Sequence, residues 1–365
     1  MKPKFVQVKN YLLNLFEREQ FVNGRQLPTE FELMDELDVS RNTIRKAILE
    51  LENEGIVNRK HGSGTFFTAL KEEKSSSGGL IGLGNFYFMD YIYPEIIRGI
   101  EDTLYKSGYS LVLANCNQDY SRELASIQRL VDQGIKGLIL EPSRNFLLDK
   151  EHPMMRLLGS LKIPVVATHW GGANTDFSTV TINDKQAGYQ AVKYLLDKGH
   201  ARIGMIYKND VQAACFRYDG YCRAMKEAGL EVLPELIVSY DDQDEARDKN
   251  QGYICTEELF YKSGKNVTAL FYFNDNIALQ GYEALKELNL NIPDDISVMG
   301  FDNFHHTHLV NPPLTTFEHP KYNLGKWAAK ILIDEIEQGE RMMPMELIFE
   351  PVLIERESVK DLTLQ

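Results

Sequence analysis

The first seventy residues show three helical patterns followed by a glycine-rich hairpin, and this order constrains the fold more than any other feature. Residues 4–20 carry apolar side chains at helical spacing, which predicts a first helix. Thr29 and Glu32 have the spacing of a capping box, so a second helix is expected over about residues 30–37. A third helix begins at Ser40, a residue type that commonly caps helices, and the short turn before it predicts a helix-turn-helix unit.

The third helix has one apolar side and one basic side. Arg45 and Lys46 point away from the apolar stripe, Arg41 projects from the first turn, and Gly55 ends the helix. In helix-turn-helix proteins this helix enters the major groove with its N-terminal end first, where arginine can pair with guanine through two hydrogen bonds. A basic helix face by itself is more often only solvated, but here the caps, the turn and the stripe coincide. The stripe consists of Ile44, Ala47, Ile48 and Leu51.

A hairpin pattern directly after this helix strengthens the DNA-binding interpretation. Residues 56–60 predict a strand, residues 61–64 (HGSG) a tight glycine turn, and residues 65–67 the return strand. Such a hairpin is the wing of a winged helix, and its basic tip, which includes His61, suits contact with phosphates or the minor groove. The glycines allow the backbone to approach a DNA duplex closely.

This region resembles the DNA-binding domain of the GntR family of regulators. The resemblance rests on PTE at residues 28–30, SRNTIRKA at 40–47 and the GxGTF ending at 62–66, and it covers nearly all of residues 1–70. It implies operator DNA as a partner. The DNA-contacting residues that we predict are Lys4, Arg41, Thr43, Arg45, Lys46, His61 and Gly62.

The rest of the chain is different in pattern. Residues 71–79 (KEEKSSSGG) are charged and then Ser/Gly-rich, which predicts a flexible linker. From residue 80 onward short apolar strands alternate with helical stretches, which predicts an α/β domain with helices covering parallel sheets. About 280 residues is long for one such unit and favours two lobes. The expected strands cover residues 80–86, 111–115, 137–141, 165–169, 203–207, 269–273 and 296–301.

Polar and aromatic side chains gather where these strands end. In open α/β sheets ligands bind at the carboxyl ends of strands, and rings that cover a sugar's C–H face combine well with groups that hydrogen-bond its hydroxyls. Arg217 lies near the start of a helix, where a cation opposes the helix dipole, so a ligand-binding role is favoured there. The other effector-binding residues predicted from these positions are Tyr87, Asp90, Tyr91, Glu141, Arg144, His169, Asp275 and Asp302.

Several of these residues have an equally ordinary structural interpretation. Asp275 could simply cap the helix that follows it. Tyr87 and Tyr91 could pack between the lobes, and His169 could belong to the buried core. The sequence leaves these alternatives open.

From about residue 80 to residue 358 the chain resembles the effector domain of LacI/GalR repressors, which is itself similar to periplasmic sugar-binding proteins. RYDGY at 217–221, IPDDISVMGFDN at 292–303 and NPPLTTFEHP at 311–320 carry the resemblance, together with FNDNIALQGYEAL at 273–285. It implies effector contacts from Arg217, Asp275, Asp302 and His319. It also implies two lobes, one of residues 80–177 and 319–343 and the other of residues 178–317 and 345–358.

A GntR-type reader joined to a LacI-type sensor is similar to the arabinose repressors of Gram-positive bacteria. The resemblance implies a multidomain fold, with an N-terminal winged helix-turn-helix domain (α+β) and a C-terminal periplasmic-binding-protein-like α/β domain. It also implies a homodimer on a palindromic operator that is released by a small sugar, L-arabinose above all. The alternatives are the same architecture with another sugar, a nucleoside or a purine, or an enzyme that uses the cleft between the lobes.

Charge and cysteine usage agree with this interpretation. Residues 1–70 contain ten Lys and Arg against ten Asp and Glu, so the remaining chain carries the whole net charge of −13. The four cysteines form no CxxC pair, and the sequence contains no run of about eighteen apolar residues. The first residues lack the apolar stretch and cleavage site of a secretory signal, so none is expected. We therefore expect a cytoplasmic protein without a cofactor, a metal site or membrane association.

Overall fold

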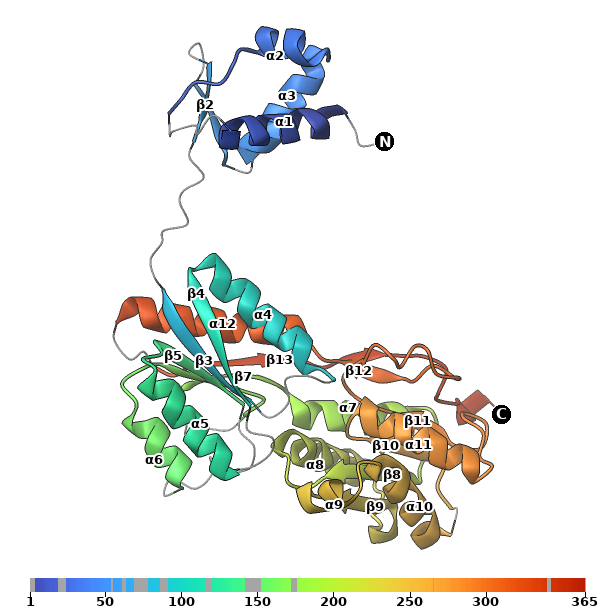
Figure 1. Ribbon diagram of the computed structural model, residues 1–365. Helices are drawn as coiled ribbons and strands as arrows, with labels where there is room; N and C mark the ends of the chain where they lie inside the picture. The colour runs from blue at the N-terminus through green and yellow to red at the C-terminus, as the bar shows by residue number, and fades with distance from the viewer. Residues whose placement is uncertain are drawn as a thin grey trace. The chain divides into compact units, whose positions relative to one another are not determined.

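The computed structural model divides into two compact units, residues 1–78 and 79–365, and each is described by itself (Figure 1). None of the described helices is long and apolar enough to cross a membrane. Residues 71–77 of the predicted linker and the predicted site residues His61, Gly62, Tyr87, Asp90 and Arg144 lie outside the described residues. The structure describes residues 4–18, 24–53, 55–60, 64–68, 78–85, 91–115, 120–141, 152–171, 176–264, 266–339 and 343–364.

The N-terminal unit contains the predicted helix-turn-helix and both strands of the wing. Thr29 and Glu32 form the expected capping box, in which the Thr29 side chain accepts a hydrogen bond from the Glu32 backbone N–H. Leu12, Leu33 and Ile44 are fully buried and belong to one core shared by the three helices. The elements are α1 Lys4–Arg18, α2 Glu30–Leu37, α3 Arg41–Asn53, β1 Val57–Lys60 and β2 Gly64–Phe67.

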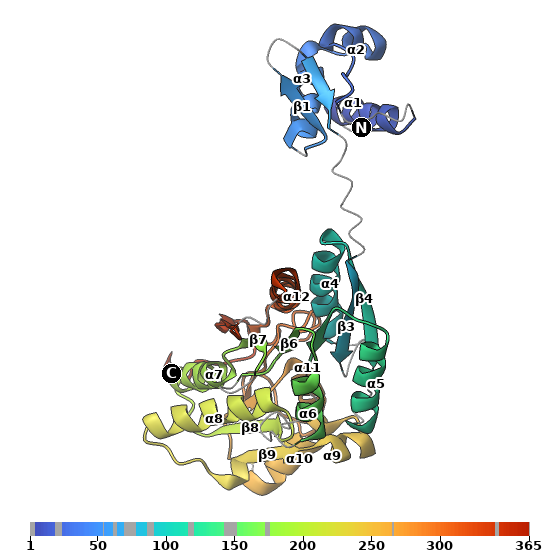
Figure 2. The same cartoon turned by 90° about the vertical axis from the view of Figure 1, so that its left-hand side faces the viewer.

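The second unit begins with a lobe built on a six-stranded parallel sheet, in the order β13-β7-β6-β5-β3-β4. Helices α4 and α12 cover one face of the sheet, and α5 and α6 cover the other (Figures 1 and 2). The strands are β3 Gly79–Asn85, β4 Tyr109–Asn115, β5 Gly137–Leu140, β6 Val165–Thr168, β7 Ser178–Ile182 and β13 Glu346–Phe349. The helices are α4 Tyr93–Lys106, α5 Tyr120–Asp132, α6 Pro153–Ser160 and α12 Lys321–Gln338.

The second lobe has a four-stranded parallel sheet in the order β11-β10-β8-β9. Helices α7 and α8 pack on one face and α10 and α11 on the other. A two-stranded antiparallel sheet, β12 Thr316–Glu318 with β14 Val352–Ile354, lies where the chain passes between the lobes. The other elements are α7 Asp184–Asp197, β8 Ile203–Lys208, α8 Gln212–Glu227, η2 Pro234–Leu236, β9 Ile237–Tyr240, α9 Asp242–Arg247, α10 Gln251–Ser263, β10 Ala269–Tyr272, α11 Asp275–Glu287, β11 Ser297–Met299 and η3 Leu362–Leu364.

The strand pairing corrects two of the predicted lobe boundaries. Residue 178 was expected to begin the second lobe, but residues 178–182 form strand β7, which pairs with β6 in the first-lobe sheet. Strand β13 pairs with β7 in the same sheet, although residues 345–358 were expected in the second lobe. The physical reason is burial: Ser178 is fully buried, and its hydroxyl satisfies the Glu335 carboxylate at 2.5 Å and the Met345 N–H at 3.0 Å within this lobe.

Two glycines allow α7 and α8 to touch through their backbones. A Cβ atom at Gly188 would lie 1.9 Å from the Arg217 carbonyl oxygen, and one at Gly220 would lie 2.1 Å from the Lys185 carbonyl oxygen. Neither position therefore accepts a larger side chain without separating the helices. This close approach brings Arg217 of α8 against Asp184, the first residue of α7.

Candidate functional site

The exposed basic residues of α3 are held in place by one carboxylate from α2. Glu30 accepts a hydrogen bond from Arg41 Nε at 2.7 Å and another from Arg45 Nε at 3.0 Å. Both arginine side chains remain about half exposed, at 48% and 51%. Because Glu30 uses the Nε atoms, the outer guanidinium nitrogens stay available for another acceptor.

Glu30 is ionised through these contacts. Burial alone would raise the pKa of Glu30, but the hydrogen bonds and charges of Arg41 and Arg45 outweigh it, and the pKa is lowered. The carboxylate therefore fixes two guanidinium groups at the start of α3, which is the end expected to enter a major groove.

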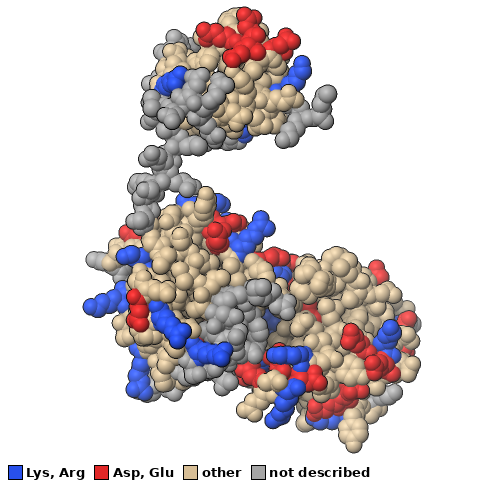
Figure 3. Space-filling model, viewed as in Figure 1, with Lys and Arg blue, Asp and Glu red and all other residues tan. Residues whose placement is uncertain are grey.

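The other predicted DNA-contacting residues on this unit differ in how far their side chains are exposed and bound within the protein. Lys4 and Lys46 are exposed, and the Lys46 Nζ atom lies 4.1 Å from the centre of the Phe5 ring. The Thr43 hydroxyl lies 2.8 Å from the Ser40 hydroxyl in the helix cap, so it is already engaged within the protein. On the face of this unit shown in Figure 3, acidic side chains gather over α2, and this patch is unsuited to phosphates.

Replacing Glu30 with glutamine is expected to lower the preference for operator over random DNA by about tenfold. The change frees two arginine side chains, and reordering each one costs about 0.5–1.5 kcal/mol. It also removes a negative charge, so binding to random DNA should become stronger rather than weaker. Anisotropy titrations with both DNAs would measure the ratio, and an unchanged ratio would contradict a positioning role for Glu30.

The effector domain contains a cavity of about 570 Å³ between its two lobes, at the carboxyl ends of the strands. Its lining combines aromatic rings with carboxylates, amides, two histidines and basic side chains, as expected for a polyhydroxylated ligand. Six predicted effector residues line it: Tyr91, Glu141, His169, Arg217, Asp302 and His319.

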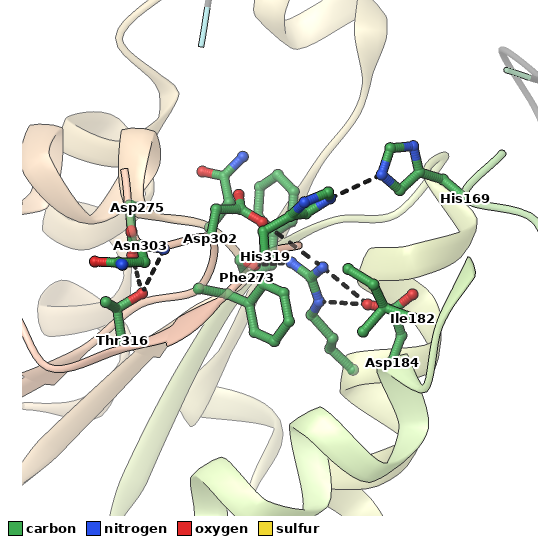
Figure 4. A network of polar contacts seen from close by, with 12 residues as sticks. His169, Ile182, Asp184, Phe273, Asp275, Asp302, Asn303, Thr316 and His319 are labelled. Atoms are coloured by element: carbon green, nitrogen blue, oxygen red, sulfur yellow. Dashed lines mark hydrogen bonds and ion pairs between the residues drawn. The ribbon is translucent and has the colours of Figure 1, made fainter. Parts of the chain in front are cut away.

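Arg217 is the centre of a buried polar network in this cavity. Its neighbours Asp184, Phe273 and Asp302 are labelled in Figure 4. Its guanidinium binds Asp184 Oδ1 at 2.8 Å through both Nε and Nη2, and it donates to the Phe273 carbonyl oxygen. Asp302 Oδ1 lies 4.0 Å from Nη2, and the Phe301 ring centre lies 3.5 Å from the guanidinium carbon. Burial raises the pKa of Asp184 even though Arg217 opposes this shift. Burying these carboxylates costs free energy, and the Arg217 guanidinium that faces them offsets part of this cost.

Tyr91 joins the two lobes. It comes from the segment before α4 in the first lobe, and its hydroxyl donates to Asp302 Oδ2 and accepts the Asp275 backbone N–H at 3.1 Å in the second lobe. Its ring centre lies 4.8 Å from that of Phe304. Tyr91 thus packs between the lobes and also lines the cavity, and its contact with an effector stays a prediction.

Asp275 differs from its prediction as an effector contact. The side chain is fully buried, does not line the cavity, and accepts hydrogen bonds from the Phe304 N–H at 2.8 Å and the Thr316 hydroxyl at 2.7 Å. Burial, together with the charge of Asp302, raises its pKa well above the ordinary value. Asp275 therefore fixes the loop after β11 against β12, and the helix cap itself is supplied by Asn274.

His169 and His319 form a pair on the cavity wall. Their Nε2 atoms are 2.8 Å apart, and His169 Nδ1 lies 3.2 Å from Glu141 Oε1. Burial would lower the pKa of His169, but Glu141 raises it above its ordinary value. Burial lowers the pKa of His319 well below its ordinary value, and the neighbouring His169 lowers it further. The two pKa values are therefore shifted in opposite directions, and the Nε2–Nε2 hydrogen bond joins rings of different basicity.

Buried polar atoms around this pair have no partner among the described residues. They are Trp170 Nε1, His319 Nδ1 and Glu141 Oε2, and each residue lines the cavity. A buried polar group without a hydrogen bond is costly, so these atoms favour a ligand with hydroxyl groups. Trp170 was not predicted as an effector contact, although its position shortly after strand β6 was an available signal.

Three charged residues that line the cavity were not predicted from the sequence: Lys208, Asp242 and Glu245. Lys208 is buried at the end of β8, with its Nζ atom 2.5 Å from Asp242 Oδ1 and 2.6 Å from Glu245 Oε2. These carboxylates belong to α9, which follows strand β9. The apolar pattern did not predict β9, so the sequence did not indicate that residues after it would line the cavity.

Acid is expected to destabilise the effector domain through His319. Because the folded-state pKa of His319 lies well below 6.5, only the unfolded chain takes up a proton there below about pH 6.5. The neutral His319 therefore lowers the free energy of unfolding only below that pH, by roughly 1 kcal/mol for each further pH unit, and has no such effect above it. Urea unfolding of the full chain between pH 5 and 7 should show a flatter profile for His319→Gln.

An exposed histidine provides the control for this experiment. His308 lies in the loop after β11, and His308→Gln should keep the profile of the unaltered chain. If His319→Gln retained the full acid loss, the buried neutral ring would not be its cause.

The described residues contain no group of three or more His, Cys, Asp or Glu side chains arranged to hold a metal ion. His305 and His306 lie against the Phe304 ring, at centre distances of 4.3 and 4.8 Å. Cys215, Cys222 and Cys255 are free thiols.

Both parts of the chain match known family models. Residues 5–67 match the gntR family of bacterial regulatory proteins, and residues 192–359 match the periplasmic binding protein-like domain. The winged helix and the α/β sensor predicted from the sequence are therefore confirmed.

Two relatives are similar over the full length. The chain is 32% identical over 360 residues to the arabinose metabolism transcriptional repressor of Geobacillus stearothermophilus. This alignment covers 99% of this chain and 98% of the relative. It is 31% identical over 375 residues to the repressor of the same name from Halalkalibacterium halodurans, with coverages of 99% and 98%. A solved complex of the transcriptional regulator CelR with cellobiose has a TM-score of 0.68 at 24% identity, covers 88% of this chain and 91% of its own, and shows the same fold.

Proposed function

Because this chain belongs to the family of the arabinose metabolism transcriptional repressors, we propose that it binds operator DNA and releases it when its cavity binds a small sugar. The chain is a transcriptional regulator rather than an enzyme. We propose L-arabinose as the sugar and a homodimer on a palindromic operator as the binding form. The names of the two full-length relatives support the choice of sugar.

The cavity lining is the observation that carries the sugar proposal. Arg217, Asp302 and His319 offer donors and acceptors at one end, and Trp170 adds a flat ring whose Nε1 atom has no partner among the described residues. A pentose has several hydroxyl groups, each of which both donates and accepts, so it can satisfy such a mixed lining.

The contacts of Tyr91 suggest how sugar binding reaches the DNA reader. Asp302 lines the cavity and also accepts the Tyr91 hydroxyl, so a sugar bound to Asp302 changes the contact that joins the lobes. Tyr91 lies two residues before Tyr93, the first residue of α4, and α4 packs against α12 through Gly99 and Gly325. A shift in lobe closure is therefore passed to α4 and to the beginning of the domain. The sugar acts only through its different affinity for the two lobe arrangements.

Fluorescence anisotropy would test this proposal directly. The full-length protein is titrated onto labelled DNA from upstream of its own gene, and then L-arabinose, other pentoses, hexoses and nucleosides are added in turn. We expect binding to the DNA and release by L-arabinose at a lower concentration than by any other compound. Release by a different sugar or a nucleoside would replace the proposed effector, and DNA binding that no compound disturbs would contradict the cavity as the controlling site.

A further inference from the structure

Phe31 is a large apolar side chain that the N-terminal unit leaves in water. It lies in the first turn of α2 and is 66% exposed. The guanidinium carbon of Arg41 lies 5.2 Å from the centre of its ring, and Arg41 is the first residue of α3. The ring therefore lies beside the end of α3 that is expected to enter the major groove.

The contacts within the protein do not account for this exposure. Glu30 already holds Arg41 through Nε at 2.7 Å, so Arg41 does not need the ring to fix its position. A cation–π contact at an exposed site contributes little. Single exposed apolar side chains are common on protein surfaces, but this one lies beside Arg41, whose side chain is 48% exposed.

We propose that Phe31 determines operator specificity by contacting the 5-methyl group of thymine in the major groove. Thymine presents this methyl group at the groove edge, and apolar side chains such as phenylalanine are its usual partners. Arg41, beside the ring, binds Glu30 through Nε, and its outer guanidinium nitrogens suit guanine, so each half-site should place a thymine close to a guanine. The inference rests on the proposed function, because it requires α3 to lie in the major groove of the operator.

Deoxyuridine tests this contact, because it lacks only the 5-methyl group of thymine. A duplex is first selected from random-sequence DNA by the full-length protein, and its thymines are then replaced by deoxyuridine, one at a time and all together. We expect affinity to fall about fourfold for each methyl that loses its contact, and roughly fifteenfold when both half-sites lose one.

Variants assign this loss to one side chain. Phe31→Ala should bind thymine DNA more weakly than the unaltered protein and should bind thymine and uracil DNA equally. Phe31→Leu, which keeps an apolar surface, should retain part of the discrimination. The control is Leu49→Ala, because Leu49 is also exposed, at 49%. It lies eight residues, or about 12 Å along the helix, after Arg41, so its replacement should leave the discrimination between thymine and uracil unchanged.

The outcomes separate this inference from the proposed function. If the protein selects no duplex, operator binding itself fails, and the role of Phe31 fails with it. If a duplex is selected, three results overturn the role of Phe31 alone: a site without thymine, equal affinity for thymine and uracil DNA, or discrimination that persists in Phe31→Ala.

Discussion

Replacing Arg217 with methionine is expected to abolish the response to sugar and to lower the stability of the effector domain by roughly 3–5 kcal/mol. The side chain is 5% exposed and is the cation that faces both Asp184 and Asp302. Methionine preserves much of the volume but leaves Asp184 buried without the guanidinium that it binds. Urea unfolding would measure the stability, and anisotropy on operator DNA would measure the lost release by sugar.

The pH dependence distinguishes lost charge pairing from poor packing. A protonated Asp184 needs no cation, so the loss of stability in Arg217→Met should be smaller at pH 5 than at pH 8. Arg223 provides the control because it lies on the same helix but is half exposed, and Arg223→Met should change stability by less than about 0.5 kcal/mol. A full sugar response in a folded Arg217→Met protein would remove Arg217 from the effector site.

Replacing Arg45 with alanine is expected to weaken operator binding by at least about 30-fold. A bidentate contact between arginine and guanine is worth about 1–3 kcal/mol, and a dimer on a palindrome loses it twice. Arg45 is half exposed and makes its ion pair with Glu30 on the surface, so the folded protein should lose little stability. Anisotropy at fixed salt would measure affinity, and thermal unfolding would confirm that the variant is folded.

Arg45→Lys separates base recognition from simple charge. Lysine keeps the positive charge but not the planar pair of donors, so specific binding should fall while binding to random DNA stays nearly unchanged. If Arg45→Lys bound the operator as tightly as the original protein, Arg45 would contact phosphate rather than a base.

The N-terminal unit could be predicted from sequence almost completely, because its signals are local. A capping box needs only Thr29 and Glu32, and the buried stripe of α3 needs only the helical period. The continuous apolar strands of the effector domain were likewise predicted, as at β5 and β10. Strand β7 was missed because its buried hydroxyl groups interrupt the apolar run, as at Ser178 and Thr181.

The sequence placed polar and aromatic residues at the strand ends that form the cavity, but only the tertiary structure determined which side chains contact each other there. Tyr91 and Asp302 meet across 211 residues, and Arg217 meets Asp184 only because two glycines let their helices touch. The sequence placed Asp275 at a strand end but gave no sign that Thr316 and the Phe304 N–H would occupy its oxygens. Helix caps and periodic stripes depend on residues within one or two turns. Whether a buried polar atom is free for a ligand depends instead on every chain segment that packs around it.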